Sequence, residues 1–168
     1  SDVTNHCSAN CHLPAQDAVM DNGRPVILVG NPNVGKSALF AHFTGHRVDI
    51  SNYPGTTVEV TQGQILVDQT EMMLIDTPGV QSLLPHSEDE RVTRDMLLAG
   101  APWAVLQVAD TKNLRRALLL TFQLAEYEQP FVLALNMADE AEALGISVDA
   151  QRLAQMLGAD VVSTVATG

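Results

Sequence analysis

The stretch that most restricts the fold of this chain is Gly-Asn-Pro-Asn-Val-Gly-Lys-Ser, residues 30–37. Its spacing, Gly-x-x-x-x-Gly-Lys-Ser, follows an apolar run at 26–29 and precedes a helical pattern over 36–43. A strand, a glycine-rich turn and a helix in this order form a phosphate-binding loop, because backbone N–H groups and the helix N-terminus converge on the anion. We expect Lys36 to reach the β- and γ-phosphates of a nucleotide and the Ser37 hydroxyl to bind Mg²⁺.

Short apolar runs and helical patterns alternate along the rest of the chain. The expected strands are 26–29, 58–67, 71–75, 103–108, 131–135 and 160–164, and the expected helices are 36–43, 87–98, 114–127 and 148–157. Only three residues separate the second and third strands, which favours an antiparallel hairpin there. The pattern as a whole predicts an α/β fold with a mainly parallel six-stranded sheet and helices on both faces. For the helix over 114–127 we expect a buried face made of Leu114, Leu118, Phe122 and Ala125.

Residues 1–24 differ from the rest, since they are polar, carry no period and end in a turn signal. We expect a flexible N-terminal arm at 1–24 and one domain at 25–168. Four soft or borderline metal ligands lie in the arm: His6, Cys7, Cys11 and His12. They could bind Zn²⁺ or iron, but a zinc site normally takes a second ligand pair from a distant part of the chain. A flexible arm with reactive thiols is the favoured interpretation, and two cysteines in all favour a reducing cytoplasm.

The charge balance limits the partners. Nine Lys and Arg stand against twenty Asp and Glu, which gives a net charge of −11. A nucleic acid or an anionic lipid surface would be repelled, so neither is expected as a partner. The longest apolar runs fall far short of the roughly 20 residues that span a bilayer, so we expect this piece to be soluble.

A second motif, Asp76-Thr77-Pro78-Gly79, follows the expected strand 71–75. A carboxylate at the carboxyl end of a strand lies at the edge where ligands bind in a doubly wound sheet. We expect Asp76 to hold Mg²⁺ through water and the Gly79 N–H to meet the γ-phosphate. The alternative is a plain turn of these four residues.

A third motif, Asn136-Met137-Ala138-Asp139, follows the strand 131–135 and reaches the same edge. A carboxylate at Asp139 can accept the N1–H and 2-amino protons of guanine, and adenine has neither donor. Asn136 is expected to tie loops together. The alternative is that Asp139 caps a helix.

Together these motifs resemble translation-factor-type (Ras-like) P-loop GTPases, and in detail the N-terminal G domain of the ferrous-iron transporter FeoB. The resemblance covers about 25–168 and is carried by the segments 30–37, 51–59, 82–95 and 135–140. Most GTPases of this superfamily have lysine where this chain has Met137, and methionine there is typical of FeoB. The chain is expected to be part of a longer membrane transporter and to stop before the last helix of such domains.

The resemblance implies roles for single residues. Thr57 resembles the threonine that binds Mg²⁺ and senses the γ-phosphate, in a first switch at 55–59, and a second switch begins at Gly79. Val165-Ala166 stands where a Ser-Ala pair is expected, so the Ala166 N–H is assigned to guanine O6. The predicted nucleotide-binding residues are Gly30, Asn31, Pro32, Asn33, Val34, Gly35, Lys36, Ser37, Ala38, Gly55, Thr56, Thr57, Val58, Glu59, Asp76, Thr77, Pro78, Gly79, Asn136, Met137, Ala138, Asp139, Val165 and Ala166.

For hydrolysis the predicted catalytic residues are Asn33, Lys36, Thr57 and Gly79. Val80 occupies the position where many GTPases have the glutamine that orients water, and it has no polar atom. The resemblance implies that Asn33 holds an activating K⁺, beside Mg²⁺ on Ser37, Thr57 and Asp76. The alternative is that Asn33 only shapes the loop. Among the arginines we expect Arg47 to be the nearest to the phosphates.

The resemblance further implies a slow GTPase that switches between GTP and GDP states and regulates Fe²⁺ uptake by an attached membrane permease, at the cytoplasmic face of the membrane. Self-association through the switch regions is a further expectation. Three alternatives stay open: a soluble Era-like GTPase, a nucleotide-gated binding module with negligible hydrolysis, and an ATPase.

Overall fold

The computed structural model describes residues 23–45 and 47–166, and the arm predicted at 1–24, with its four metal-ligand candidates, lies almost wholly outside them. The elements are β1 Val26–Gly30, α1 Lys36–Thr44, β2 Val48–Asn52, β3 Glu59–Val67, β4 Thr70–Asp76, α2 Glu88–Ala99, β5 Ala104–Asp110, a 3₁₀ turn η1 Thr111–Asn113, α3 Leu114–Glu126, β6 Phe131–Asn136, α4 Ala138–Ala143, α5 Ala150–Leu157 and β7 Asp160–Ser163.

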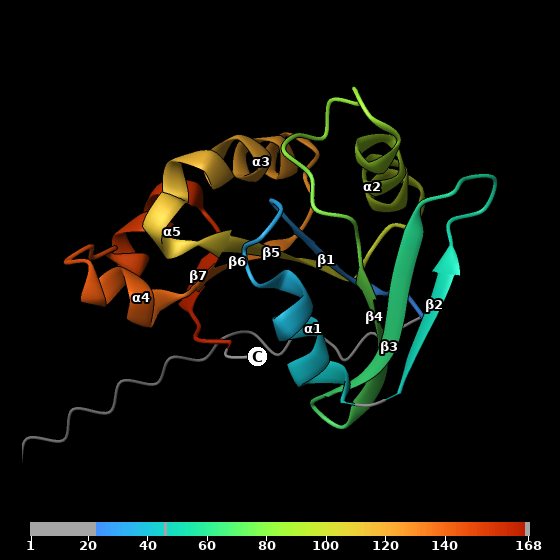
Figure 1. The fold of residues 1–168 in the computed structure, drawn as a ribbon, viewed down its shortest axis with the longest axis horizontal. Coiled ribbons are helices and arrows are strands. Elements are labelled where there is room, and N and C mark those ends of the chain that lie inside the picture. The colour runs from blue at the N-terminus through green and yellow to red at the C-terminus, as the bar shows by residue number, and fades with distance from the viewer. Residues whose placement is uncertain (1–22, 46, 167–168) are drawn as a thin grey trace, which may run out of the picture.

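One sheet holds all the described strands, in the order β2-β3-β4-β1-β5-β6-β7 (Figure 1). β4, β1, β5, β6 and β7 run parallel to one another, and β2 and β3 add two antiparallel pairings at one edge. The α/β fold with a mainly parallel sheet is therefore confirmed, as is the hairpin of β3 and β4.

The prediction of six strands is wrong, because the sheet has seven. The missed strand is β2, and every one of its residues is exposed, including Ile50 at 65%. An edge strand that buries nothing gives no apolar run and no one-sided alternation to detect. Its conformation comes from pairing with β3, in which Val48 lies opposite Gly63 and Asn52 opposite Glu59.

Helices cover both faces of the sheet. On one face, Leu39 and Phe40 of α1 pack with Leu28 of β1. On the other face, α2 and α3 pack against Ile27 and Val29 of the same strand (Figure 1). All five residues of β1 are buried, as expected for a central parallel strand covered on both faces.

The buried face predicted for α3 is wrong for two of its four residues, whereas Leu114 and Leu118 are half-buried. Phe122 is 57% exposed and Ala125 is exposed, and the helix buries Ala117, Leu120 and Leu124 instead. The helical period was right but the phase was not. Apolar residues occur on nearly all sides of this helix, so only the packing against the sheet selects its buried face.

Candidate functional site

Three predicted motifs meet at one edge of the sheet. Gly30, Asp76 and Asn136 are the last residues of β1, β4 and β6, and the carboxyl ends of parallel strands lie at the same edge. β1 lies between β4 and β5 at the centre of the sheet. The chain continues from β1 into β2, β3 and β4 on one side of it, and β5, β6 and β7 follow on the other side. Such a switch point is where doubly wound sheets bind ligands.

The loop after β1 surrounds a hollow of about 420 Å³. The hollow is lined by Asn31, Pro32, Asn33, Gly35, Lys36, Ser37, Ala38 and Gly79. α1 begins at its floor, so the first N–H groups of the helix face this space. Hollow and helix N-terminus together form an arrangement suited to phosphate.

Two glycines allow neighbouring motifs to approach each other closely. Gly35 has φ 82°, and a Cβ there would collide with the Asn136 amide nitrogen. A Cβ on Gly79 would come within 2.9 Å of the Pro32 Cα. Each glycine therefore marks a point where one motif touches another, and a side chain would push the two motifs apart.

Lys36 joins the first motif to the second. Its ammonium group forms an ion pair with Asp76 and donates a hydrogen bond to the Thr77 carbonyl oxygen. Both side chains are largely buried, at 9% and 12% exposed. The Thr77 hydroxyl is fixed in turn by a 2.8 Å hydrogen bond to the Leu28 carbonyl of β1.

A second hollow, of about 550 Å³, shares Lys36, Ser37 and Gly79 with the first. Ser37, Thr57 and Asp76, the three residues assigned to Mg²⁺, all line it. Hydroxyl and carboxylate oxygens are the ligands that this hard cation takes, so the donor set fits Mg²⁺.

Sequence reasoning missed two carboxylates beside this hollow, Glu88 and Asp89 in the first turn of α2. Ser87 and Glu90 form a capping box at the start of this helix. The Thr57 hydroxyl donates to Glu88 Oε2 at 3.5 Å, so the first switch touches α2 here. Glu88 and Asp89 therefore face the site, in addition to lying at the N-terminus of α2.

The loop that carries Thr57 is a tight turn between β2 and β3. Tyr53 donates its N–H to the Val58 carbonyl at 2.8 Å, and the Thr56 hydroxyl donates to the Tyr53 carbonyl at 2.9 Å. Gly55 takes φ 77° in this turn. Since the Thr56 hydroxyl is used within the turn and the Thr57 side chain is exposed, Thr57 is the residue of this pair that can face a ligand.

Asn136 ties three loops together, as predicted. Fully buried, it donates from Nδ2 to the Val34 carbonyl at 3.0 Å, and its Oδ1 accepts from the Thr164 hydroxyl and the Ala166 N–H. The Ala166 N–H assigned to guanine O6 is thus directed to Asn136. Asp139 is exposed in the first turn of α4, and Val165 is 52% exposed.

A cluster beside this third loop was also missed: Asp110, Lys112 and Glu140. The sequence contained a signal for this cluster, because Asp110 directly ends an apolar strand run, as Asp76 does. Both carboxylates therefore lie at the same edge of the sheet. The Thr111 hydroxyl donates to the Asn136 carbonyl at 2.6 Å and so fixes this segment to the third loop.

The arginine that lines a hollow with the phosphate loop is Arg116 of α3, and the expectation for Arg47 stays a prediction. Arg116 and Asn33 line a hollow of about 200 Å³. Arg116 Nε donates to Gln81 Oε1 at 3.2 Å. Helix α3 and the phosphate loop are far apart in sequence, and only the folded sheet brings them together.

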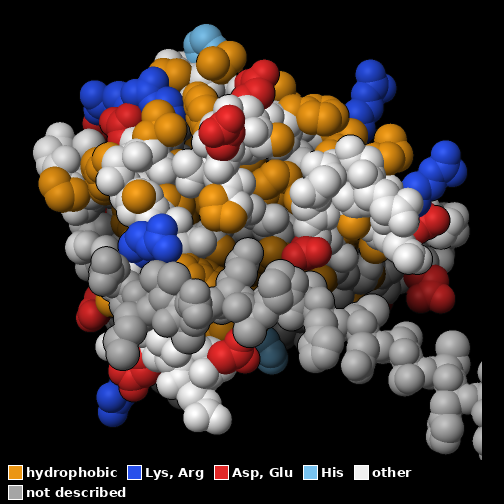
Figure 2. All heavy atoms as spheres, turned by 180° about the vertical axis from the view of Figure 1, so that it is seen from behind, with side chains coloured by type: hydrophobic (Ala, Val, Ile, Leu, Met, Phe, Trp, Pro, Cys, Tyr) orange, Lys and Arg blue, Asp and Glu red, His pale blue; other side chains and the backbone are white. Residues whose placement is uncertain are grey.

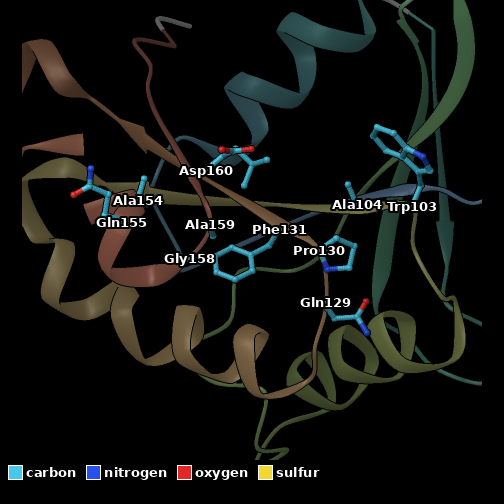
Figure 3. Close-up of a pocket in the computed structure, with 11 residues that line it drawn as sticks. Trp103, Ala104, Gln129, Pro130, Phe131, Ala154, Gln155, Gly158, Ala159 and Asp160 are labelled. Atoms are coloured by element: carbon cyan, nitrogen blue, oxygen red, sulfur yellow. The ribbon is translucent and has the colours of Figure 1, made fainter. Parts of the chain in front are cut away.

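A hollow of about 620 Å³, larger than those at the motifs, lies elsewhere (Figure 3). It is at the amino ends of β5, β6 and β7, where Trp103, Phe131 and Asp160 lie, and so at the opposite edge of the sheet. None of the three motifs reaches it. We assign the site by the converging motifs and not by size.

Comparison with known proteins shows the family of this chain. The family model described as ferrous iron transport protein B matches residues 24–168. The chain therefore belongs to the FeoB family. An FeoA/FeoB fusion protein of Porphyromonas gingivalis is 41% identical over 165 residues, which is 96% of this chain and 20% of the relative. The Fe(2+) transporter FeoB of Salmonella typhimurium is 40% identical over 144 residues, 83% of this chain and 19% of the relative.

Solved FeoB structures show the same fold. The cytosolic domain of T. maritima FeoB in apo form superposes with a TM-score of 0.81 at 39% identity, covering 85% of this chain and 57% of that one. A mutant S. thermophilus NFeoB bound to GDP gives 0.79 at 40% identity, covering 85% and 56%. The FeoB G-domain of Methanococcus jannaschii gives 0.75 at 36% identity, covering 85% and 86%.

The chain spans about a fifth of the length of the curated FeoB relatives it matches. Within residues 23–45 and 47–166, no helix is long and apolar enough to cross a membrane. In the same residues, no three His, Cys, Asp or Glu side chains gather into a metal-ligand group.

Acidic and basic side chains are scattered over the face seen from behind (Figure 2), and the net charge is −11.

Proposed function

We propose that this chain is the guanine-nucleotide-binding and GTP-hydrolysing domain of an FeoB-type transporter. The observation that carries the proposal is the convergence of three motifs on one edge of the sheet, through the Lys36–Asp76 ion pair and the Asn136–Val34 hydrogen bond. A structural relative with 40% identity binds GDP. Membership of the FeoB family argues against the Era-like alternative.

Each part of the site has a task in this proposal. The loop at 30–37 binds the phosphates through its N–H groups and Lys36. On binding, Lys36 gives up its contacts with Asp76 and the Thr77 carbonyl and contacts phosphate oxygens instead. Ser37, Thr57 and Asp76, the last through water, would hold Mg²⁺. When bound, Mg²⁺ neutralises charge on the phosphate oxygens.

Asp139 selects guanine, because it stands exposed in the first turn of α4 next to the buried Asn136. An adenine base would leave its carboxylate unpaired, which argues against an ATPase. The Ala166 N–H would turn from Asn136 Oδ1 to guanine O6. We propose that Met137 and Val165, which adjoin Asn136 and Ala166 in the chain, flank the base.

Hydrolysis needs help from a group other than a glutamine side chain. Val80, the residue after Gly79, is 2% exposed and apolar, so it cannot orient water. Asn33, with φ 63°, lies in the phosphate loop and lines the hollow shared with Gly79. We propose that its side-chain oxygen holds K⁺ beside the phosphates, and that K⁺ offsets charge that grows during the reaction.

The test is turnover of GTP and ATP in matched KCl and NaCl, with wild type and Asn33→Ala. We expect faster GTP hydrolysis in KCl, loss of that difference in Asn33→Ala, and little ATP turnover. Equal wild-type rates in both salts would refute the K⁺ role, and Asn33 would then only shape the loop. Absence of GTP turnover with intact binding would favour a binding module without hydrolysis.

The role of the whole protein follows from its relatives. We propose that GTP and GDP states of the first and second switches regulate Fe²⁺ passage through an attached permease, with this domain at the cytoplasmic face of the membrane. The −11 charge argues against nucleic acid as a partner. Self-association through the switches would be tested by the molar mass of the GTP-bound and GDP-bound states in solution.

A further inference from the structure

Lys112 lies in η1, directly after β5, and the proposed nucleotide roles leave it unused. Its loop is rigidly placed. Asp110 accepts the Lys112 N–H at 2.9 Å and caps the turn, and the Thr111 hydroxyl bonds to the Asn136 carbonyl. The backbone of Lys112 is therefore fixed to the loop that carries Asp139.

The ammonium group of Lys112 has three neighbours. It contacts Glu140 Oε2 at 2.6 Å, Met137 Sδ at 3.2 Å and Asp110 Oδ1 at 3.3 Å. A thioether sulfur is a weak acceptor, so the hydrogen bond toward Met137 is the one that a stronger acceptor would most readily replace. The side chain is 22% exposed and can reach a ligand at this edge.

The direction of Met137 shows where that acceptor would be. Met137 takes φ 59° at the start of α4, and its Cε lies 3.5 Å from the position that a Cβ on Gly35 would occupy. Met137 thus lies between Lys112 and the phosphate loop, with Asp139 two residues further on. Lys112 places a positive charge at the junction of the phosphate loop and the base-reading loop.

We propose that Lys112 is an affinity-determining residue of this site, which turns its ammonium group from Met137 Sδ to an oxygen of the nucleoside half of a bound guanine nucleotide. The proposal rests on the assignment of Asp139 as the base reader. None of the three neighbours of the Lys112 ammonium group is a residue assigned to Mg²⁺, so we expect Lys112 to act on GDP and GTP alike.

The charge needed for this role is stable. The hydrogen bond that Lys112 donates to Glu140 is the largest of the effects that raise the pKa of Lys112 above the ordinary lysine value. Burial opposes it, and the hydrogen bond to Asp110 and the charges of both carboxylates add to the rise. A raised pKa keeps the ammonium form at every pH below it. A nucleotide that binds at neutral pH therefore always encounters Lys112 in its positively charged form.

The experiment measures Kd for GDP and GTP with five variants, of which Asp139→Asn tests the base-reader assignment. Lys112→Ala should raise both Kd values by the same factor, roughly tenfold, as for one charged hydrogen bond at a partly exposed position. Glu140→Gln keeps the ammonium group but removes the ion pair, so affinity should stay or improve. Arg115→Ala removes one positive charge from an exposed position three residues along the chain and should change little. Met137→Lys in the Lys112→Ala background should restore affinity, because it returns an ammonium group to the same corner.

Each outcome decides. If Glu140→Gln lost as much nucleotide affinity as Lys112→Ala, Lys112 would only anchor α4. If Arg115→Ala lost as much, the loss would be a general charge effect. Either result would overturn the proposal. Wild-type affinity in Asp139→Asn would overturn the base-reader assignment and the role of Lys112 with it. Weak binding by Asp139→Asn together with unchanged affinity in Lys112→Ala would overturn the role of Lys112 alone. Thermal melts of all variants show that each is folded.

Discussion

Replacing Gly35 with alanine tests the close approach of the phosphate loop and the base-reading loop. Gly35 has φ 82° and ψ 19°, a left-handed conformation that costs an alanine about 1–2 kcal/mol. The new Cβ would also collide with the Asn136 amide nitrogen, which donates to the Val34 carbonyl. Because Asn136 is fully buried, losing that bond leaves polar groups unsatisfied, at about 1–3 kcal/mol. The two effects together predict that Gly35→Ala lowers the free energy of unfolding by about 2–5 kcal/mol.

Gly158 provides a matched control. It ends α5 with φ 65° and ψ 28°, and a Cβ there would meet nothing within 4 Å. Gly158→Ala therefore measures the left-handed strain alone, about 1–2 kcal/mol. The assay is urea unfolding of both variants, with GDP affinity measured alongside. We expect Gly35→Ala to lose more stability than Gly158→Ala and to lose GDP affinity, while Gly158→Ala keeps it.

A double mutant separates the collision from any other cause. In the Asn136→Ala background the amide is gone, so Gly35→Ala should cost only the strain. Equal losses for Gly35→Ala and Gly158→Ala, or full additivity with Asn136→Ala, would refute the reasoning. The two loops would then not depend on this contact.

Other predictions concern single groups. Asp139→Asn should weaken GDP binding by roughly a hundredfold and improve xanthosine diphosphate binding, and equal GDP affinity by calorimetry would contradict the guanine-reading role. Lys36→Ala should weaken both nucleotides, whereas Thr57→Ala should spare GDP and remove the extra hydrogen-exchange protection that GTP gives the first switch. If GTP and GDP already protect that switch equally in wild type, it is not a switch. The raised pKa of Lys112 means that its contribution is present at low and neutral pH and disappears only as pH rises through that value, so the ratio of GDP Kd between Lys112→Ala and wild type should be equal at about pH 6 and about pH 9. Deleting residues 1–22 should leave GDP affinity and melting temperature nearly unchanged, and stoichiometric metal in the intact protein would speak against that expectation.

Much of the site could be read from the sequence because its chemistry is local. The loop at 30–37 needs its glycines, lysine and serine within eight residues, and Asp76 and Asn136 each follow an apolar run that forms a buried strand. Parallel strands bring such ends to one edge, so the pattern predicted that the three motifs would meet. The parallel pairings of β1, β4, β5 and β6 place the three motifs at one edge, as that prediction states.

Only the tertiary structure decided features that depend on partners far away in the sequence. β2 is a strand because β3 pairs with it, and α3 buries Leu120 instead of Phe122 because the sheet fixes the rotation of a helix that is apolar on nearly all sides. Lys112 gains its neighbours Met137 and Glu140 only when β5 and β6 lie side by side. A sequence specifies which groups a segment carries, but the packing of the sheet and its helices determines which groups from separate segments come within hydrogen-bonding distance.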